Sequence, residues 1–150
     1  MRYEAPLSGA RLWLLRCTRA LTENEATTDS EAADPRLRGR TYGVPFQEVW
    51  TLAKRLADAG LRGWSLVEAN DQEGRIVAEA RTRRLEFVDD VEIRVTLDDD
   101  AQTRVEMTSR SRVGRADLGA NARRIHRFFR RLDHEMGASR SRAGRSRGSE

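Results

Sequence analysis

Residues 90–113, D-V-E-I-R-V-T-L-D-D-D-A-Q-T-R-V-E-M-T-S-R-S-R-V, contain two runs in which apolar and polar residues alternate. The first run is 91–97 and the second begins at Thr103, and a period of two is typical of strands with one buried face. The Asp-rich residues 98–102 between them favour a turn, and they lack the alternating ligands and the glycine of a calcium loop. The stretch therefore predicts an antiparallel β-hairpin.

The segments upstream of this hairpin extend it into a meander. Residues 64–69 and 75–85 predict two further strands, separated by a turn, N-D-Q-E-G, at 70–74. Residues 40–44 predict a shorter strand at the start of the domain. Because short turns join the last four strands, we expect these strands to be antiparallel.

Two segments have apolar residues at spacings of three and four, which predict amphipathic helices. One follows Pro45, which suits a first helical turn, and is stopped by Gly60. The other runs from about Leu118 to Met136. The expected fold class is α+β: a four- to five-stranded antiparallel sheet with two helices on one face, in the order strand, helix, four strands, helix.

Two helices cover only one face of such a sheet, so the other face is expected to meet solvent. Its predicted side chains alternate in sign, which suits cross-strand ion pairs on a solvated surface and favours that interpretation over a binding surface. These residues are Glu79, Arg81, Glu92, Arg94, Arg104 and Glu106.

Three segments lie outside the predicted domain of residues 37–136. Residues 1–22 contain an amphipathic helix over 7–22, which either docks on the domain or contacts a partner helix or an anionic membrane surface. Residues 23–36 are polar and aperiodic and predict a flexible linker. Residues 137–150 have no apolar anchor and predict a disordered tail, whose Arg/Ser pattern resembles weakly RNA-binding tails.

The composition is that of a highly charged domain, with 38% apolar and 35% charged residues. All but one of the 28 basic residues are arginine, and we interpret the pI of about 10.1 as a small arginine excess, not as a nucleic-acid surface. The single cysteine, Cys17, excludes an intramolecular disulfide and a cysteine-based zinc site, and we expect no metal or cofactor. No apolar run approaches the roughly 18 residues of a spanning helix, which favours a cytoplasmic location or one peripheral to a membrane.

The stretch S-R-S-R-V-G-R-A-D-L-G-A-N at 109–121 is the candidate functional site. Its first two arginines are two apart on a strand, so their guanidiniums share a face, and Gly114 permits a tight bend. Asp117 suits the N-cap of the following helix, and helix N-termini attract anions. The functional hypothesis is a carboxylate or phosphate pocket. Its ligating residues would be Arg110, Arg112, Arg115 and Asn121.

A structural network is the alternative for the same arginines. Asp89 and Asp90 open the neighbouring strand, and their carboxylates beside Arg112 or Arg124 would form charge-assisted bonds that fix strand register. Adjacent strand residues face opposite sides, so the two aspartates are unsuited to act as paired catalytic acids.

Three motifs in this order resemble the bacterial and plastid family called domain of unknown function 1499. They are L-R-G-R-T-Y-G-V-P-F-Q-E-V-W at 37–50, F-V-D-D-V-E-I-R-V at 87–95 and S-R-S-R-V-G-R-A-D-L-G-A-N-A-R-R-I at 109–125, and the resemblance covers about 37–133. The family signature falls on Asp89, Asp90, Ser109, Ser111, Arg112, Gly114, Asp117, Gly119, Asn121 and Arg124.

The resemblance implies no reaction, because the family is named for having no assigned function. From the residues we expect a small non-catalytic domain that binds an anionic small molecule or a protein partner. The alternatives are an enzyme that uses Asp89, Asp90 and Arg112, and a peripheral membrane or scaffold protein that acts through residues 7–22. His126 and His134 are interpreted as surface histidines, not as catalytic bases.

Overall fold

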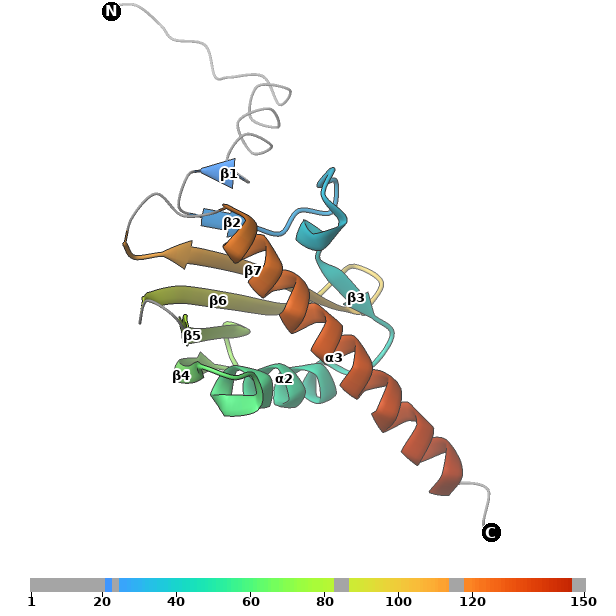
Figure 1. Ribbon diagram of the computed structural model, residues 1–150. Coiled ribbons are helices and arrows are strands. Elements are labelled where there is room, and N and C mark those ends of the chain that lie inside the picture. The colour runs from blue at the N-terminus through green and yellow to red at the C-terminus, as the bar shows by residue number, and fades with distance from the viewer. Residues whose placement is uncertain (1–20, 23–24, 83–86, 114–117, 147–150) are drawn as a thin grey trace, which may run out of the picture.

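The computed structural model describes residues 21–22, 25–82, 87–113 and 118–146, with the side chains of 25–82, 87–113 and 119–137. The described residues form an α+β fold in which one antiparallel sheet carries two helices on a single face (Figure 1). The strands are β1 Leu21–Thr22, β2 Glu25–Thr27, β3 Arg40–Tyr42, β4 Trp64–Asn70, β5 Arg75–Arg81, β6 Val88–Leu97 and β7 Thr103–Ser111. The helical elements are η1 Pro35–Leu37, α2 Phe46–Arg55, η2 Leu56–Gly60 and α3 Leu118–Ser146.

The β6–β7 hairpin lies in the middle of the sheet, as the alternating stretch predicts. Val95 is opposite Val105 and Asp89 is opposite Ser111, and the strand order is β1-β2-β7-β6-β5-β4 with β3 also paired to β7. The order strand, helix, four strands, helix is confirmed by β3, α2, β4 to β7 and α3. The expected count of four to five strands is too low, because the described residues form seven.

One additional strand, β2, comes from the segment expected to be a linker, and the other, β1, lies at the end of the predicted N-terminal helix. β2 pairs with one half of β7, with Ala26 opposite Ser109, and β3 pairs with the other half, so the two short strands occupy one edge of β7 in succession. Ala26 is fully buried, and the backbone N–H of Thr28 donates to the carbonyl of Met107 at 2.9 Å. The flexible linker over 23–36 is therefore wrong for residues 25–36, because the edge of β7 offers this polar segment backbone partners.

The predicted N-terminal helix over 7–22 falls almost entirely outside the described residues. Leu21 and Thr22 form β1, which pairs with β2, so the predicted helix does not reach its expected end. Nothing in the described residues tests whether residues 7–20 dock on the domain.

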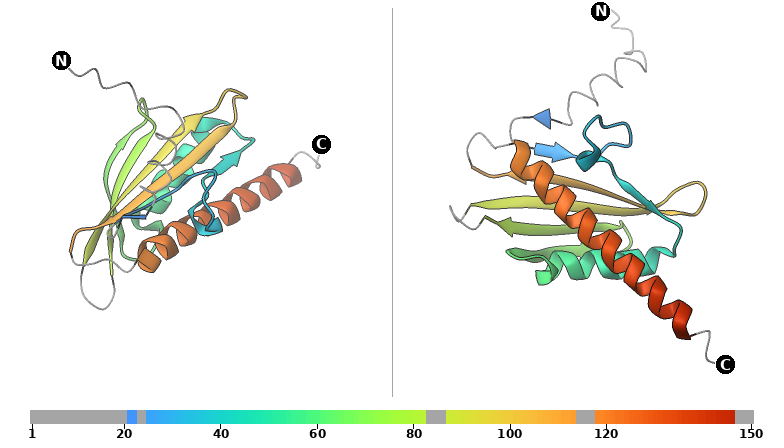
Figure 2. Two further views of the ribbon diagram at one scale, coloured as in Figure 1. Left: turned by 90° about the horizontal axis from the view of Figure 1, so that it is seen from above. Right: turned by 45° about the vertical axis from the view of Figure 1, so that its right-hand side comes forward.

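The core lies between the sheet and the two helices (Figure 2). Alternate residues of β5, β6 and β7 are buried against the helices, including Ile76, Ile93 and Met107. The α-helical part of the first helix ends at Arg55, earlier than expected, and the chain turns through Ala59, whose φ is 64°. From α3 the buried apolar side chains are Ala122, Ile125, Phe128, Phe129, Leu132 and Met136.

Helix α3 continues past the sheet to Ser146, as the red end of the ribbon shows in Figure 1. The predicted disordered tail over 137–150 is therefore wrong for 137–146, and residues 147–150 lie outside the described part of the chain. Adding residues to an existing helix avoids the cost of nucleation.

The sheet face opposite the helices carries ion pairs, as its alternating charges predict. The Nε atom of Arg75 lies 3.3 Å from a carboxylate oxygen of Glu92, and the Nε atom of Arg94 lies 2.8 Å from the other. Arg104 and Glu106 pair on β7 at 2.8 Å. Most arginines of the open face are therefore paired with carboxylates of the same face.

Candidate functional site

The structure describes three of the four candidate ligating residues and does not bring these three together. Arg110 and Arg112 project from β7 on the open face of the sheet, whereas Asn121 is fully buried on the helix face. Arg115 lies outside the described residues, as do Gly114 and Asp117. The carboxylate or phosphate pocket expected at residues 110–121 is therefore not assembled from the three residues that can be placed.

Both described arginines of that set have carboxylate partners. The Nε atom of Arg112 donates to Oδ1 of Asp90 at 3.0 Å, and its Nη2 donates to Oε1 of Glu79 at 2.7 Å. The Nε atom of Arg110 donates to Oε2 of Glu25 on β2 at 2.7 Å. Hydrogen bonding from Arg112 lowers the pKa of the Asp90 carboxyl, and Asp90 and Glu79 in turn raise the pKa of Arg112. These contacts tie neighbouring strands together across the open face.

A second set of polar residues lies on the other side of the same strands, and we call it the buried polar cluster. It joins β6, β7 and the first turns of α3, and two of its members, Ser109 and Asn121, have no exposed surface. Its members are Asp89, Ser109, Ser111, Asn121 and Arg124.

Arg124 is the centre of the buried polar cluster. Its Nη2 donates to Oδ2 of Asp89, and its Nη1 donates to Oγ of Ser109 at 2.8 Å and to Oδ1 of Asn121 at 2.7 Å. Ser109 donates to Asn121 at 2.8 Å, and the Asn121 amide donates to Oγ of Ser111 at 3.1 Å. Apart from the bond between Arg124 and Asn121 within α3, these contacts join α3 to β6 or β7, so the cluster fixes how α3 sits on the hairpin.

Burial dominates the electrostatics of the cluster. It lowers the pKa of Arg124, and the neighbouring Asp89 carboxylate opposes that effect. Asp89 is only 4% exposed and is bonded to a guanidinium, so it is poorly placed to exchange protons with a substrate. The arrangement suits a structural ion pair more than an acid or a base.

The family signature therefore divides between the two faces of the hairpin. Asp90 and Arg112 are on the open face, and five other signature residues make up the buried polar cluster. Gly119 lies in the first turn of α3, and the two remaining positions are outside the described residues. Adjacent Asp89 and Asp90 do face opposite sides, as the strand period predicts.

One polar contact that the sequence did not reveal joins β3 to α3. The hydroxyl of Tyr42 donates to Oδ1 of Asp133 at 2.7 Å, and Arg40 approaches the other oxygen at 3.4 Å. The guanidinium of Arg40 also lies over the Phe129 ring, 5.2 Å from its centroid. Burial, followed by the bond to Asp133, raises the pKa of Tyr42. The partners are 91 residues apart, so no local pattern could have indicated them.

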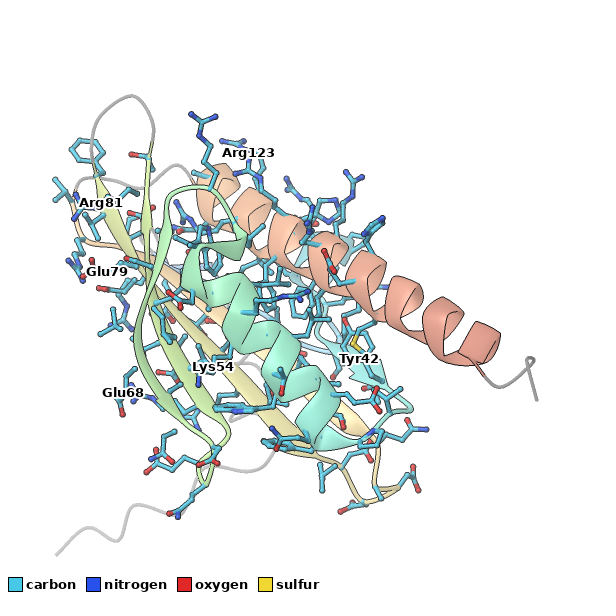
Figure 3. All side chains as sticks on the ribbon, turned by 90° about the horizontal axis from the view of Figure 1, so that it is seen from below. Tyr42, Lys54, Glu68, Glu79, Arg81 and Arg123 are labelled. Carbon is cyan, nitrogen blue, oxygen red and sulfur yellow. The ribbon has the colours of Figure 1, made fainter. Side chains whose placement is uncertain are left out.

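A row of basic side chains on α3 was likewise not singled out from the sequence. Arg123, Arg127, Arg130 and His134 recur at helical spacings of four, three and four, and all four are exposed on the solvent side of the helix. We call this row the outer face of α3. Figure 3 shows Arg123 at the start of the helix, directed away from the sheet.

The acidic side chains near the outer face of α3 form hydrogen bonds and ion pairs with other residues. Asp133 is held by Tyr42 and Arg40, and Glu135 pairs with Arg55 at 3.1 Å and with Arg131 at 2.9 Å. Among the described residues, neither Arg127 nor Arg130 has a carboxylate within ion-pair distance. These two arginines therefore give the outer face a positive charge that the net charge of the whole chain conceals.

Two kinds of site are not found in the part of the chain that the structure describes. There, no three histidine, cysteine, aspartate or glutamate side chains group in a way that could hold a metal ion. None of the described helices combines the length and the apolar character needed to span a membrane.

Comparison with known proteins places the chain in a family without assigning it an activity. No curated protein matches the sequence. No solved structure matches it either. The family described as proteins of unknown function, DUF1499, matches residues 17–132, which include β2, the hairpin and the buried polar cluster. The chain is therefore a member of the DUF1499 family.

Proposed function

We propose that this protein is a non-catalytic binding domain whose anionic partner contacts the outer face of α3. The observation that carries the proposal is the contrast between two sets of arginines. Most of those on the open sheet face, such as Arg94 and Arg112, are paired with carboxylates, whereas Arg127 and Arg130 are exposed without such a partner among the described residues. Uncompensated guanidiniums on a rigid helix attract anions.

An enzyme that uses Asp89, Asp90 and Arg112 receives no comparable support. Asp89 is bonded to Arg124 inside the helix interface, and Asp90 is on the opposite face of the sheet. The pKa of Asp90 is lowered, whereas a catalytic acid at neutral pH needs a raised value. Membrane contact through residues 7–22 stays a prediction, because residues 1–20 are outside the described part of the chain.

Binding to immobilised heparin, a generic polyanion, tests the proposal. The test variant is Arg127→Glu/Arg130→Glu, and the control is Lys54→Glu/Arg81→Glu, which makes the same change in net charge at exposed sites away from α3 (Figure 3). We expect the test variant to elute at much lower salt than wild type and the control to elute close to wild type. Equal shifts in both variants would mean that only net charge matters and would overturn the proposal.

A further inference from the structure

We infer that the anionic partner of the outer face of α3 is the phosphodiester backbone of a double-stranded nucleic acid, an inference that rests on the proposed function. Arg127 and Arg130, which have no carboxylate within ion-pair distance among the described residues, are separated by a helical rise of about 4.5 Å at 1.5 Å per residue. One strand of a duplex carries a charge about every 3.4 Å along the axis, so these two arginines can meet two neighbouring phosphates.

The row is held rigidly, which favours binding to a regular ligand. The opposite side of α3 inserts Ile125, Phe128, Phe129 and Leu132 into the core, and each of these side chains is fully buried. The buried polar cluster anchors the start of the helix to the hairpin through Arg124. The backbone under the arginines is therefore already ordered before binding, and planar guanidinium forks pair bidentately with phosphate oxygens.

Two other polyanionic surfaces fit the outer face less well. Recognition of single strands uses aromatic side chains that stack on unpaired bases, but both aromatic residues of α3, Phe128 and Phe129, are buried. A helix that lies on a membrane needs an apolar face to insert into the lipid, whereas the solvent side of α3 carries the basic row. Phosphate contacts without base contacts position a protein on a duplex and carry no sequence information.

Fluorescence anisotropy with labelled duplexes tests the inference on the full chain. The probes are DNA duplexes of two unrelated sequences, an RNA duplex, and the single strands of each, titrated over a series of salt concentrations. If Arg127 and Arg130 each meet a phosphate, these two contacts contribute about −2 to the slope of the logarithm of affinity against the logarithm of salt concentration. Arg127→Glu/Arg130→Glu is expected to weaken binding about tenfold or more and to reduce the slope by about 2.

The controls separate this inference from the proposed function. Lys54→Glu/Arg81→Glu should keep the wild-type slope, and both variants should unfold at the wild-type temperature because the replaced side chains are exposed. Equal affinity for the two DNA sequences supports backbone binding, and the DNA and RNA arms show which duplex is preferred. Tighter binding to single strands, or to phosphatidylserine vesicles than to any duplex, overturns the inference. Heparin binding without duplex binding also overturns it while the proposed function stands, whereas loss of both removes the proposed function.

Discussion

The guanidinium of Arg124 on α3 is bonded to the carboxylate of Asp89 on β6, 35 residues earlier in the chain and inside the interface between helix and sheet. The side chains of the pair are 10% and 6% exposed. Moving two charged groups from water into the protein interior costs free energy. The attraction between them offsets this cost only when further hydrogen bonds satisfy both groups. Ser109 and Asn121 supply those bonds to Arg124, so the cluster works as a unit.

Replacing one member of this pair should therefore be far more damaging than replacing its neighbour. Asp89→Ala leaves a buried guanidinium without its carboxylate, and we expect the free energy of unfolding to fall by about 3–5 kcal/mol in urea denaturation. Asp90→Ala is the matched control on the open face, with an expected loss of less than about 1 kcal/mol. Similar losses in the two variants would contradict a structural role that is specific to the buried pair.

The Asp90 carboxyl should report its contact with Arg112 through its own titration. Arg112→Gln removes the main donor, so the pKa of Asp90 should rise toward its ordinary value, measured by NMR of the side-chain carboxyl carbon. Because the folded-state pKa is lowered, Asp90 stabilises the fold above pH 3.8, and this contribution is lost as pH falls through the folded value. Asp90→Asn should flatten that acid dependence. An Asp90 pKa that is insensitive to Arg112→Gln would show that the pair is not formed in solution.

Tyr42 should couple the stability of the fold to alkaline pH. Its folded-state pKa is raised above 10.0, so above that pH the unfolded chain loses the proton while the folded chain keeps it, and stability falls. Tyr42→Phe removes the bond to Asp133, with an expected loss of about 1–2 kcal/mol at neutral pH, and should also flatten the alkaline limb of the stability curve. Chemical denaturation across the alkaline range measures both effects. A variant that retains the wild-type alkaline slope would assign that slope to another group.

Thr28 tests whether the segment before β3 belongs to the sheet. Its Oγ1 accepts from the backbone N–H of Met107 at 2.9 Å, and Thr28 is buried. Thr28→Val keeps the shape and leaves that N–H without an acceptor, so unfolding should become easier by about 1–3 kcal/mol. Thr27→Val is the neighbouring control, since Thr27 bonds Thr108 in a half-buried position and should matter less. No effect from Thr28→Val is the result expected of a flexible linker.

Position 74 requires glycine because of its backbone conformation and because of the atoms packed around it. Its φ is +61°, and a Cβ there would lie 2.0 Å from the carbonyl oxygen of Val95. Gly74→Ala should lower the free energy of unfolding by more than about 2 kcal/mol, through left-handed strain and displacement of β6. A Cβ at Gly43 would meet no other atom within 4 Å, so Gly43→Ala should leave stability unchanged or raise it by up to about 1 kcal/mol. Thermal and urea unfolding of the two variants distinguish these outcomes.

Local patterns in the sequence were sufficient for the elements that bury one face. The alternation from Val91 to Leu97 and the helical spacing from Ile125 to Leu132 predicted the hairpin and the last helix, because burial of one face imposes the period of the element on its apolar residues. The same period of two placed Asp89 and Asp90 on opposite faces. The hypothesis of an anion pocket also grouped Arg110 and Arg112 with Asn121, and the described residues place these on opposite faces of the sheet.

The features that the sequence did not predict depend on contacts between residues that are far apart in the chain. β2 is polar and too short to show a period, and it is a strand only because β7 offers it an unpaired edge. Whether an arginine has an ion-pair partner is likewise decided by the carboxylates that folding brings near it. Folding brings Glu79 to Arg112, whereas among the described residues no carboxylate lies within ion-pair distance of Arg127 or Arg130. Hydrogen bonds and ion pairs act over a few ångströms, and only the packed chain sets those distances.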